Sequence, residues 1–235
     1  MQRIVLTEKQ RKFAREVGSI VLGVLIALAI GELADTARWK WRVNNNLKAI
    51  GVELGGARAN LVQRSVTQPC MEKRIALIGV VLKQARRTHR LPDIGAIGYP
   101  PSQLVVNSAF QVAQSDGVLL HMDLERSRRL ASTYTLVTTA YLSLTEQEHQ
   151  SWRTLRLLEN APGDIDSDLL ASLLQAWSDA QELVHVIGVV AKQGDRRLQE
   201  DGIAVPEPLR TKVLHPEAAT CMALIVDGKP VLSTP

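Results

Sequence analysis

The stretch Val17–Gly31, VGSIVLGVLIALAIG, decides the fold of this chain, because its fifteen residues carry no charge and lie close to the N-terminus. An α-helix rises about 1.5 Å per residue, and a hydrocarbon core roughly 30 Å thick needs about 20 residues to span it. Extending the helix over residues 13–34 gives that length, with Arg15 and Glu32 near the ends, where long side chains reach the headgroups. We therefore predict a transmembrane helix over residues 13–34.

Two other interpretations of this stretch stay open. Its uncharged run is short enough for the core helix of a soluble domain. A signal peptide would also have the basic residues Arg11 and Lys12 before an apolar run, and Ala27-Leu28-Ala29 offers a small-x-small cleavage site. We expect the segment to be retained as an anchor, which makes membrane lipid a partner of this protein.

Three residues are predicted to mark the two membrane interfaces. Arg15 precedes the apolar run, and Trp39 and Trp41 follow the predicted span within two turns. Amphipathic aromatic rings and long basic side chains are favoured at the level of the headgroups. Arg15, Trp39 and Trp41 are therefore the predicted interfacial anchors.

Basic residues flank the span on both sides with only a small bias. The N-terminal flank has five of them, Arg3, Lys9, Arg11, Lys12 and Arg15, and the sixteen residues after Ala34 have four, Arg38, Lys40, Arg42 and Lys48. A short basic N-terminus usually stays in the cytoplasm. We expect a cytoplasmic segment at residues 1–12 and a periplasmic C-terminal domain, with the opposite orientation left open.

Small residues recur at every fourth position within the span. Such a stripe lets two helix backbones approach closely in lipid and gain dispersion contacts. Six of the fifteen residues are small, so a stripe of this kind could also arise by chance. The predicted helix-association residues, which favour a homo-oligomer or a membrane-protein partner, are Ser19, Gly23, Ala27 and Gly31.

An apolar seam continues beyond the membrane and predicts a helical stalk over residues 35–64. Its members, spaced alternately by four and three, are Val43, Leu47, Ile50, Leu54, Ala57 and Leu61. Gly51, Gly55 and Gly56 each lower the helix propensity here by about 1 kcal/mol relative to alanine. We expect another helix to pack closely at these glycines.

Residues 65–201 are predicted to form an antiparallel helical bundle. Pro69 is expected to kink or restart the helix, which then continues to Thr88. A loop at Leu91–Ser102 separates it from further helices, and the last helix is expected at about Ser167 to Glu200. Short connections between helices with apolar seams join antiparallel neighbours. The predicted fold class is therefore all-α.

The chain changes character over residues 202–235, which contain five of the ten prolines. The apolar residues Met222 to Val226 precede Asp227-Gly228, a pair typical of a turn. We expect an irregular tail that packs on the bundle and contains one short strand.

Cys70 and Cys221 are the two cysteines of the chain. In a periplasmic domain they would form a disulfide, because that compartment is oxidising. A loop of about 150 residues would stabilise the fold by roughly 5 kcal/mol in the chain-entropy description. In the cytoplasm they would be two buried free thiols.

No motif for chemistry is present in the sequence: it lacks GxSxG, a phosphate-binding Gly-rich loop, HExxH and CxxC. Glu146, Glu148 and His149 are interpreted as an exposed polar turn rather than a zinc site. The net charge of +4 is explained by a solvated surface, so no nucleic-acid partner is expected. No catalytic, cofactor-binding or metal-binding residue is assigned.

The run from Arg15 to Ala34, followed by the tryptophans and the stalk, resembles a group of bacterial single-pass membrane proteins of uncharacterised function. They are similar in having a glutamate before an apolar V-L-G-V-L-I-A-L core and a Trp-containing helix after it. This chain has Gly31-Glu32-Leu33 and Trp39 where many of them have Asn-x-Trp. The resemblance covers about the first 60 residues, and it implies an inner-membrane location and no known activity.

The sequence therefore indicates a membrane-anchored helical scaffold or interaction subunit, oligomeric or part of a larger inner-membrane complex. A ligand-sensing helical domain that signals through a partner is one alternative. A membrane-tethered enzyme, with an active site assembled from distant residues, is the other.

Overall fold

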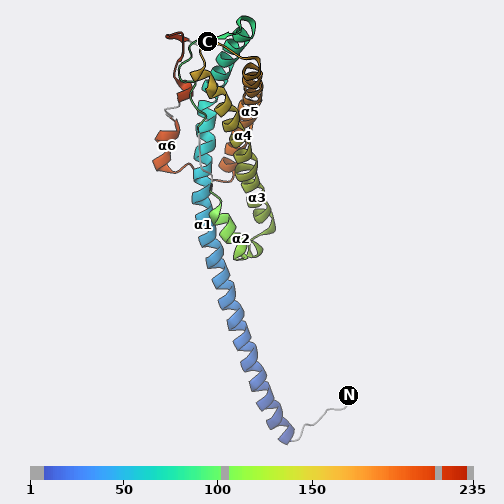
Figure 1. Ribbon diagram of the computed structural model, residues 1–235. Helices are drawn as coiled ribbons and strands as arrows, with labels where there is room; N and C mark the ends of the chain where they lie inside the picture. Colours follow the sequence, from blue (N-terminus) through green and yellow to red (C-terminus); the bar gives the residue numbers. More distant parts are fainter. Residues whose placement is uncertain (1–7, 102–105, 215–218, 232–235) are drawn as a thin grey trace.

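The computed structural model describes residues 8–101, 106–214 and 219–231, and it is an all-α protein with a long apolar helix at its N-terminal end (Figure 1). Residues 1–7 of the expected cytoplasmic segment and residues 232–235 of the tail lie outside the described residues. The longer helices are α1 (Glu8–Thr88), α2 (Ser108–Ser115), α3 (Leu124–Tyr134), α4 (Tyr141–Leu155), α5 (Ser167–Glu200) and α6 (Glu207–Leu214). Between them lie η1 (Val118–His121), the π-helical turn η2 (Thr135–Ala140) and η3 (Arg156–Asn160), and η4 (Ala219–Cys221) follows α6.

Helix α1 continues without a break through Pro69, so of the two alternatives predicted for this proline the restart is wrong. Proline has no N–H, so the carbonyl four residues before Pro69 loses its helical hydrogen bond. Pro69 is exposed, so this carbonyl lies on the solvent side of the helix. The neighbouring Thr67 hydroxyl donates to the carbonyls of Gln63 and Arg64 at 3.0 and 3.2 Å. With 81 residues, α1 is about 120 Å long.

One heptad register explains this continuity. Adding alternate steps of three and four to Leu61 gives Arg64 and Gln68, and then Met71, the first apolar residue after the proline. From Ile50 to Ala85, every position of this register is buried. The seam predicted up to Leu61 therefore continues past Pro69 to Ala85, and its polar members are Arg64 and Gln68.

Helix α5 provides the largest packing partner of α1, and α4 packs on α5 in turn. Figure 1 shows α3, α4 and α5 on one side of α1 and α6 on the other. Helix α5 has the bounds expected from the sequence. Its close approaches to α1 pair Gly194 with Leu61, Gly188 with Gln68 and Trp177 with Gly79, so later residues of α1 meet earlier residues of α5.

The apolar core has two parts, one after the other along α1. The lower core, nearer the N-terminal end, includes Ile50 to Leu61 of α1 and Ile187 to Leu198 of α5. The upper core includes Met71 to Ala85 of α1 and Leu170 to Val184 of α5. We call the described residues from Trp39 to Val231 the head, because Trp39 and Val43 already pack against the lower core. The expected stalk over residues 35–64 is therefore mostly the central helix of the head.

The three glycines of the expected stalk are not sites of close helix packing, so that prediction is wrong. Gly51 and Gly56 have no atom of the described residues within 4 Å of the place where a Cβ would stand. Gly55 is approached by Ala204 and Pro206 of the segment before α6. The close approach between helices occurs instead at Gly79, where a Cβ would stand 2.6 Å from the ring of Trp177.

The C-terminal segment is more regular than expected, because it forms α6 and a hairpin of β3 (Leu224–Val226) with β4 (Lys229–Val231). The turn lies at Asp227-Gly228 as predicted, and both residues have positive φ. A second short ladder pairs β1 (Arg90–Leu91) with β2 (Gly163–Asp164). Backbone hydrogen bonds from Gly95 to Ile225 and from Asp227 to Asp93 join the hairpin to the loop after α1.

Two glycine-to-alanine variants of α1 test this packing. Gly79→Ala should lower the free energy of unfolding by about 1–3 kcal/mol, because the new methyl group overlaps the Trp177 ring. Gly56→Ala is the matched control on the same helix, and it should raise stability by about 0.5–1 kcal/mol through helix propensity alone. Chemical unfolding of the full chain in detergent measures both, and equal effects of the two changes would contradict the packing.

Candidate membrane-proximal site

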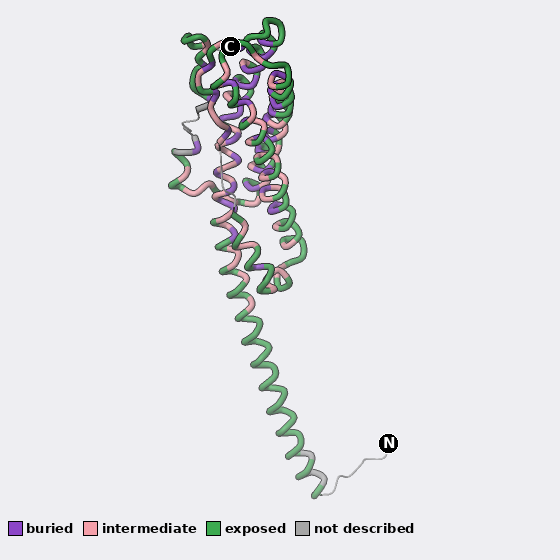
Figure 2. Tube along the Cα trace, viewed as in Figure 1, coloured by how far each residue is buried: buried purple, intermediate pink, exposed green. Residues whose placement is uncertain are grey.

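The N-terminal part of α1 is long and apolar enough to cross a membrane. Its side chains from Arg15 to Arg38 are exposed, as the green lower half of the helix shows in Figure 2. In the most apolar eighteen-residue window, no residue is buried by the described parts of the protein. A helix that is apolar all round needs an apolar environment, and the described residues do not supply one here.

The four predicted association residues lie on this exposed segment. The Ser19 hydroxyl donates to the Glu16 carbonyl at 2.9 Å and is thereby satisfied within the helix. A Cβ added at Gly23 or at Gly31 would meet no described atom within 4 Å. The described head therefore leaves the stripe open to a partner helix.

The three predicted interfacial anchors differ in their surroundings. Arg15 is exposed, and Trp41 is exposed over 66% of its surface. Trp39 is half-buried, because its ring stacks on His121 with 3.6 Å between ring centroids and 15° between the planes. The Arg42 guanidinium lies 5.2 Å from the Trp39 ring centroid. Trp39 therefore joins η1 to α1, and Trp41 is the more exposed of the two tryptophans.

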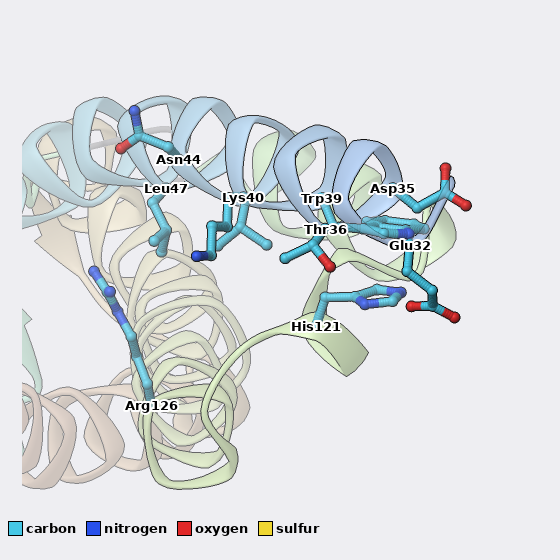
Figure 3. A pocket seen from close by; sticks show the side chains of 10 residues that line it. Glu32, Asp35, Thr36, Trp39, Lys40, Asn44, Leu47, His121 and Arg126 are labelled. Carbon is cyan, nitrogen blue, oxygen red and sulfur yellow. The ribbon is translucent and has the colours of Figure 1, made fainter. Parts of the chain in front are cut away.

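A cleft of about 680 Å³ lies beside this stack, between α1 and the start of α3 (Figure 3). Figure 3 shows Glu32 and Asp35 at one end of the cleft and Arg126 at the other. Lys40 and Thr36 line it between these ends. The cleft thus presents carboxylates and cations together, next to the end of the apolar segment.

The far wall of this cleft is held in place by local interactions. The Asp123 carboxylate caps α3 by accepting from the Arg126 N–H at 3.1 Å. Higher on α1, the Glu53 carboxylate accepts from the Tyr134 hydroxyl at 2.6 Å and from the Ala109 N–H at 2.9 Å. Burial and the Glu53 carboxylate raise the pKa of Tyr134, so this hydroxyl stays a donor. Helices α2 and α3 are thereby fastened to one carboxylate of α1.

A buried ion pair separates the two apolar cores. The Arg64 guanidinium of α1 donates to both oxygens of Glu148 of α4, at 2.9 and 2.7 Å, and the two side chains are 2% and 1% exposed. The Gln68 amide donates to the Val184 carbonyl of α5 at 2.8 Å. Gly188 leaves the space for Gln68, since a Cβ there would stand 2.5 Å from its amide. We call Arg64, Gln68 and Glu148 the polar layer.

The interpretation of Glu146, Glu148 and His149 as an exposed polar turn is therefore wrong for Glu148. Burial raises the pKa of Glu148, and the Arg64 charge and hydrogen bonds oppose that effect. Burial likewise raises the pKa of the nearby Tyr141 to about 12. Glu148 is enclosed and bidentately paired, which is a structural arrangement and gives no reason to assign it chemistry.

The sequence pattern contained a signal for this layer that motif searching misses. Arg64 and Gln68 occupy seam positions of α1, and a polar side chain at a seam position must be buried with a partner. His121 and Arg126 of the cleft had no comparable signal, since the loop and helix start that carry them meet α1 only through the tertiary fold. Among the described residues, no group of three or more His, Cys, Asp or Glu side chains could hold a metal ion.

Cys70 and Cys221 form a disulfide between α1 and η4, with their Cα atoms 4.8 Å apart. One turn further along α1, the buried Arg74 donates to the carbonyls of Ala96 and Met222. The disulfide and Arg74 together hold the C-terminal segment and the loop after β1 against the upper core.

Comparisons with protein-family models, with curated proteins and with solved structures found no match to this chain.

Removing one member of the ion pair should be far worse than removing both. Arg64→Met leaves the Glu148 carboxylate buried without its partner, and it should lower the free energy of unfolding by about 3–5 kcal/mol. The double variant Arg64→Met with Glu148→Leu should recover most of that loss, because no buried charge remains. Chemical unfolding of the full chain measures both, and a double variant as unstable as the single one would contradict this account.

The loss in Arg64→Met should also depend on pH. Burial raises the pKa of Glu148 and Arg64 lowers it, so in Arg64→Met the folded chain binds a proton at this carboxyl more readily than the unsubstituted folded chain does. Protonation therefore favours folding, and the deficit of Arg64→Met relative to the unsubstituted chain should shrink as the pH falls. The double variant lacks the carboxyl and should show no such recovery.

Proposed function

We propose that this protein is a membrane-anchored scaffold or interaction subunit of the bacterial inner membrane, which holds a helical bundle close above the bilayer. One observation carries the proposal: the exposed apolar segment and the central helix of the head belong to a single unbroken helix. A partner that binds the head is then held at a fixed height from the membrane. The bundle is proposed to be antiparallel, which the pairing of α1 with α5 supports.

The anchor is proposed to be an assembly element as well as a tether. The stripe of Ser19, Gly23, Ala27 and Gly31 is exposed and lies on a segment that no described part of the head covers. In lipid, close packing at small residues is a main source of helix association. A homo-oligomer or a complex with another membrane helix would use this face.

The head is proposed to lie in the periplasm. The Cys70–Cys221 disulfide supports this orientation, because such bonds form and persist in oxidising compartments. The small excess of basic residues on the N-terminal flank points the same way. The short segment before the span would then face the cytoplasm.

Association through the stripe can be tested with a pair of leucine variants. The unsubstituted chain, purified in mild detergent, should be oligomeric or bound to a membrane partner by crosslinking and mass photometry. Gly23→Leu should shift it toward the monomer, since the larger side chain separates the backbones. Gly18→Leu is the matched control, because Gly18 lies on the opposite side of the helix and is equally open. Monomers alone, without a co-purifying partner, would refute the proposal.

The orientation can be tested in cells by thiol labelling. Val80→Cys places a thiol on an exposed position of the head, while both native cysteines are bonded to each other. A membrane-impermeant maleimide should label this variant in intact spheroplasts and should not label the unsubstituted chain. Labelling that requires lysis would place the head in the cytoplasm.

A further inference from the structure

The lowest part of the head is a short tip, residues 117–124, which joins α2 to α3 through η1 (Figure 1). Val118, Leu119 and Met122 of the tip pack on the lower core. Leu120 does not, and it is exposed over 87% of its surface, the largest fraction among the exposed large apolar residues of the described chain. The tip therefore turns one leucine away from the protein although its neighbours pack inward.

The tip stands at the height of the lipid headgroups if α1 crosses the bilayer over residues 13–34. Its His121 stacks on Trp39, five residues or about 7.5 Å beyond the end of that span. The headgroup region adds about 5–7.5 Å to each side of the hydrocarbon core. A typical helix tilt of about 20° would lower one side of a neighbouring element by a further 3 Å or so.

The side chains at this height suit the interface between lipid and water. Leu124, the first residue of α3, is exposed over 63% of its surface. Trp41, two residues beyond Trp39 on α1, is exposed over 66%. Single exposed apolar residues are ordinary on a protein surface. Here they occur beside the end of an apolar helix, where the neighbouring phase is the bilayer rather than bulk water.

The charged side chains near the tip do not favour anionic over neutral lipids. The cleft behind the tip contains Lys40 and Arg126, but also Glu32 and Asp35. Asp35 is in turn paired with Arg38 at 3.3 Å. With both signs present, the attraction must come from burial of apolar side chains at the interface.

We propose that the tip docks on the surface of the bilayer that α1 crosses, with Leu120 and Leu124 inserted among the headgroups. This inference rests on the proposed membrane anchor and names the lipid surface as a second partner. A single helix would let the head lean freely, whereas a second point of contact fixes its tilt. The docking needs no anionic lipid, because it is apolar.

The test places an environment-sensitive fluorophore at three single cysteines of the full chain in lipid nanodiscs. Leu120→Cys reports on the tip, Val24→Cys on the span, and Val80→Cys on an exposed site of the head about 60 Å further along α1 than Trp39. All three positions are exposed, so labelling does not disturb the core. Nitroxide-bearing lipids and aqueous iodide serve as quenchers, in nanodiscs of phosphatidylcholine with and without phosphatidylglycerol.

We expect the nitroxide lipids to quench position 120 nearly as strongly as position 24, and to leave position 80 unchanged. Iodide should quench position 80 and only weakly affect position 120. The quenching at position 120 should be the same in both lipid compositions.

Three other outcomes would overturn the proposal. Quenching at position 24 without quenching at position 120 would leave the anchor in place but show that the tip stands clear of the bilayer. Protection of position 120 from both quenchers would show that a second copy or another protein covers it. Lipid quenching at position 120 only with phosphatidylglycerol would show electrostatic attraction instead. Absence of quenching by the nitroxide lipids at position 24 would refute the proposed membrane anchor itself.

Discussion

The structure depends on one constraint, the single heptad register that α1 keeps from the N-terminal end of the head, at Ile50, to Ala85 near its top. Helix α5 meets α1 along this seam and α4 packs on α5, whereas α6 meets α1 on the opposite side. Because the register does not change at Pro69, the apolar faces below and above the proline point the same way. One continuous helix results, and it connects the exposed apolar segment directly to the centre of the head.

The polar layer fixes the register of α4 and α5 along α1. An apolar seam alone would allow α5 and α4 to slide by one heptad along α1, because neighbouring layers would fit nearly as well. A displaced Arg64 would lose Glu148, and a displaced Gln68 would lose both the Val184 carbonyl and the space at Gly188. Such pairs often add little to stability compared with apolar residues, yet they penalise every wrong register. The layer is best understood as a device of alignment.

At the base of the head, α1 places the tip next to the end of the exposed apolar segment. Trp39, which the sequence predicts to face the lipid headgroups, stacks on His121 instead. This contact holds the tip against α1 near the C-terminal end of the apolar segment. The tip has little core of its own and is held by this stack, by Asp123 and by its inward apolar residues. Contacts with α1 thus place the tip close to the proposed membrane surface. The proposal that Leu120 contacts lipid rests on this tertiary position and not on the local sequence.

The sequence by itself determined the helices and their apolar faces, since periodicity and the uncharged run over residues 17–31 depend only on neighbours along the chain. It also allowed the turn at Asp227-Gly228 and the helix Ser167–Glu200 to be predicted. It did not determine which glycines are approached, that Glu148 is buried, or that Trp39 stacks on His121. Those features depend on residues far apart in sequence, such as Gly79 with Trp177 and Arg64 with Glu148. Only the tertiary structure decides them, because a local pattern states what a residue can bury but not what will stand opposite it.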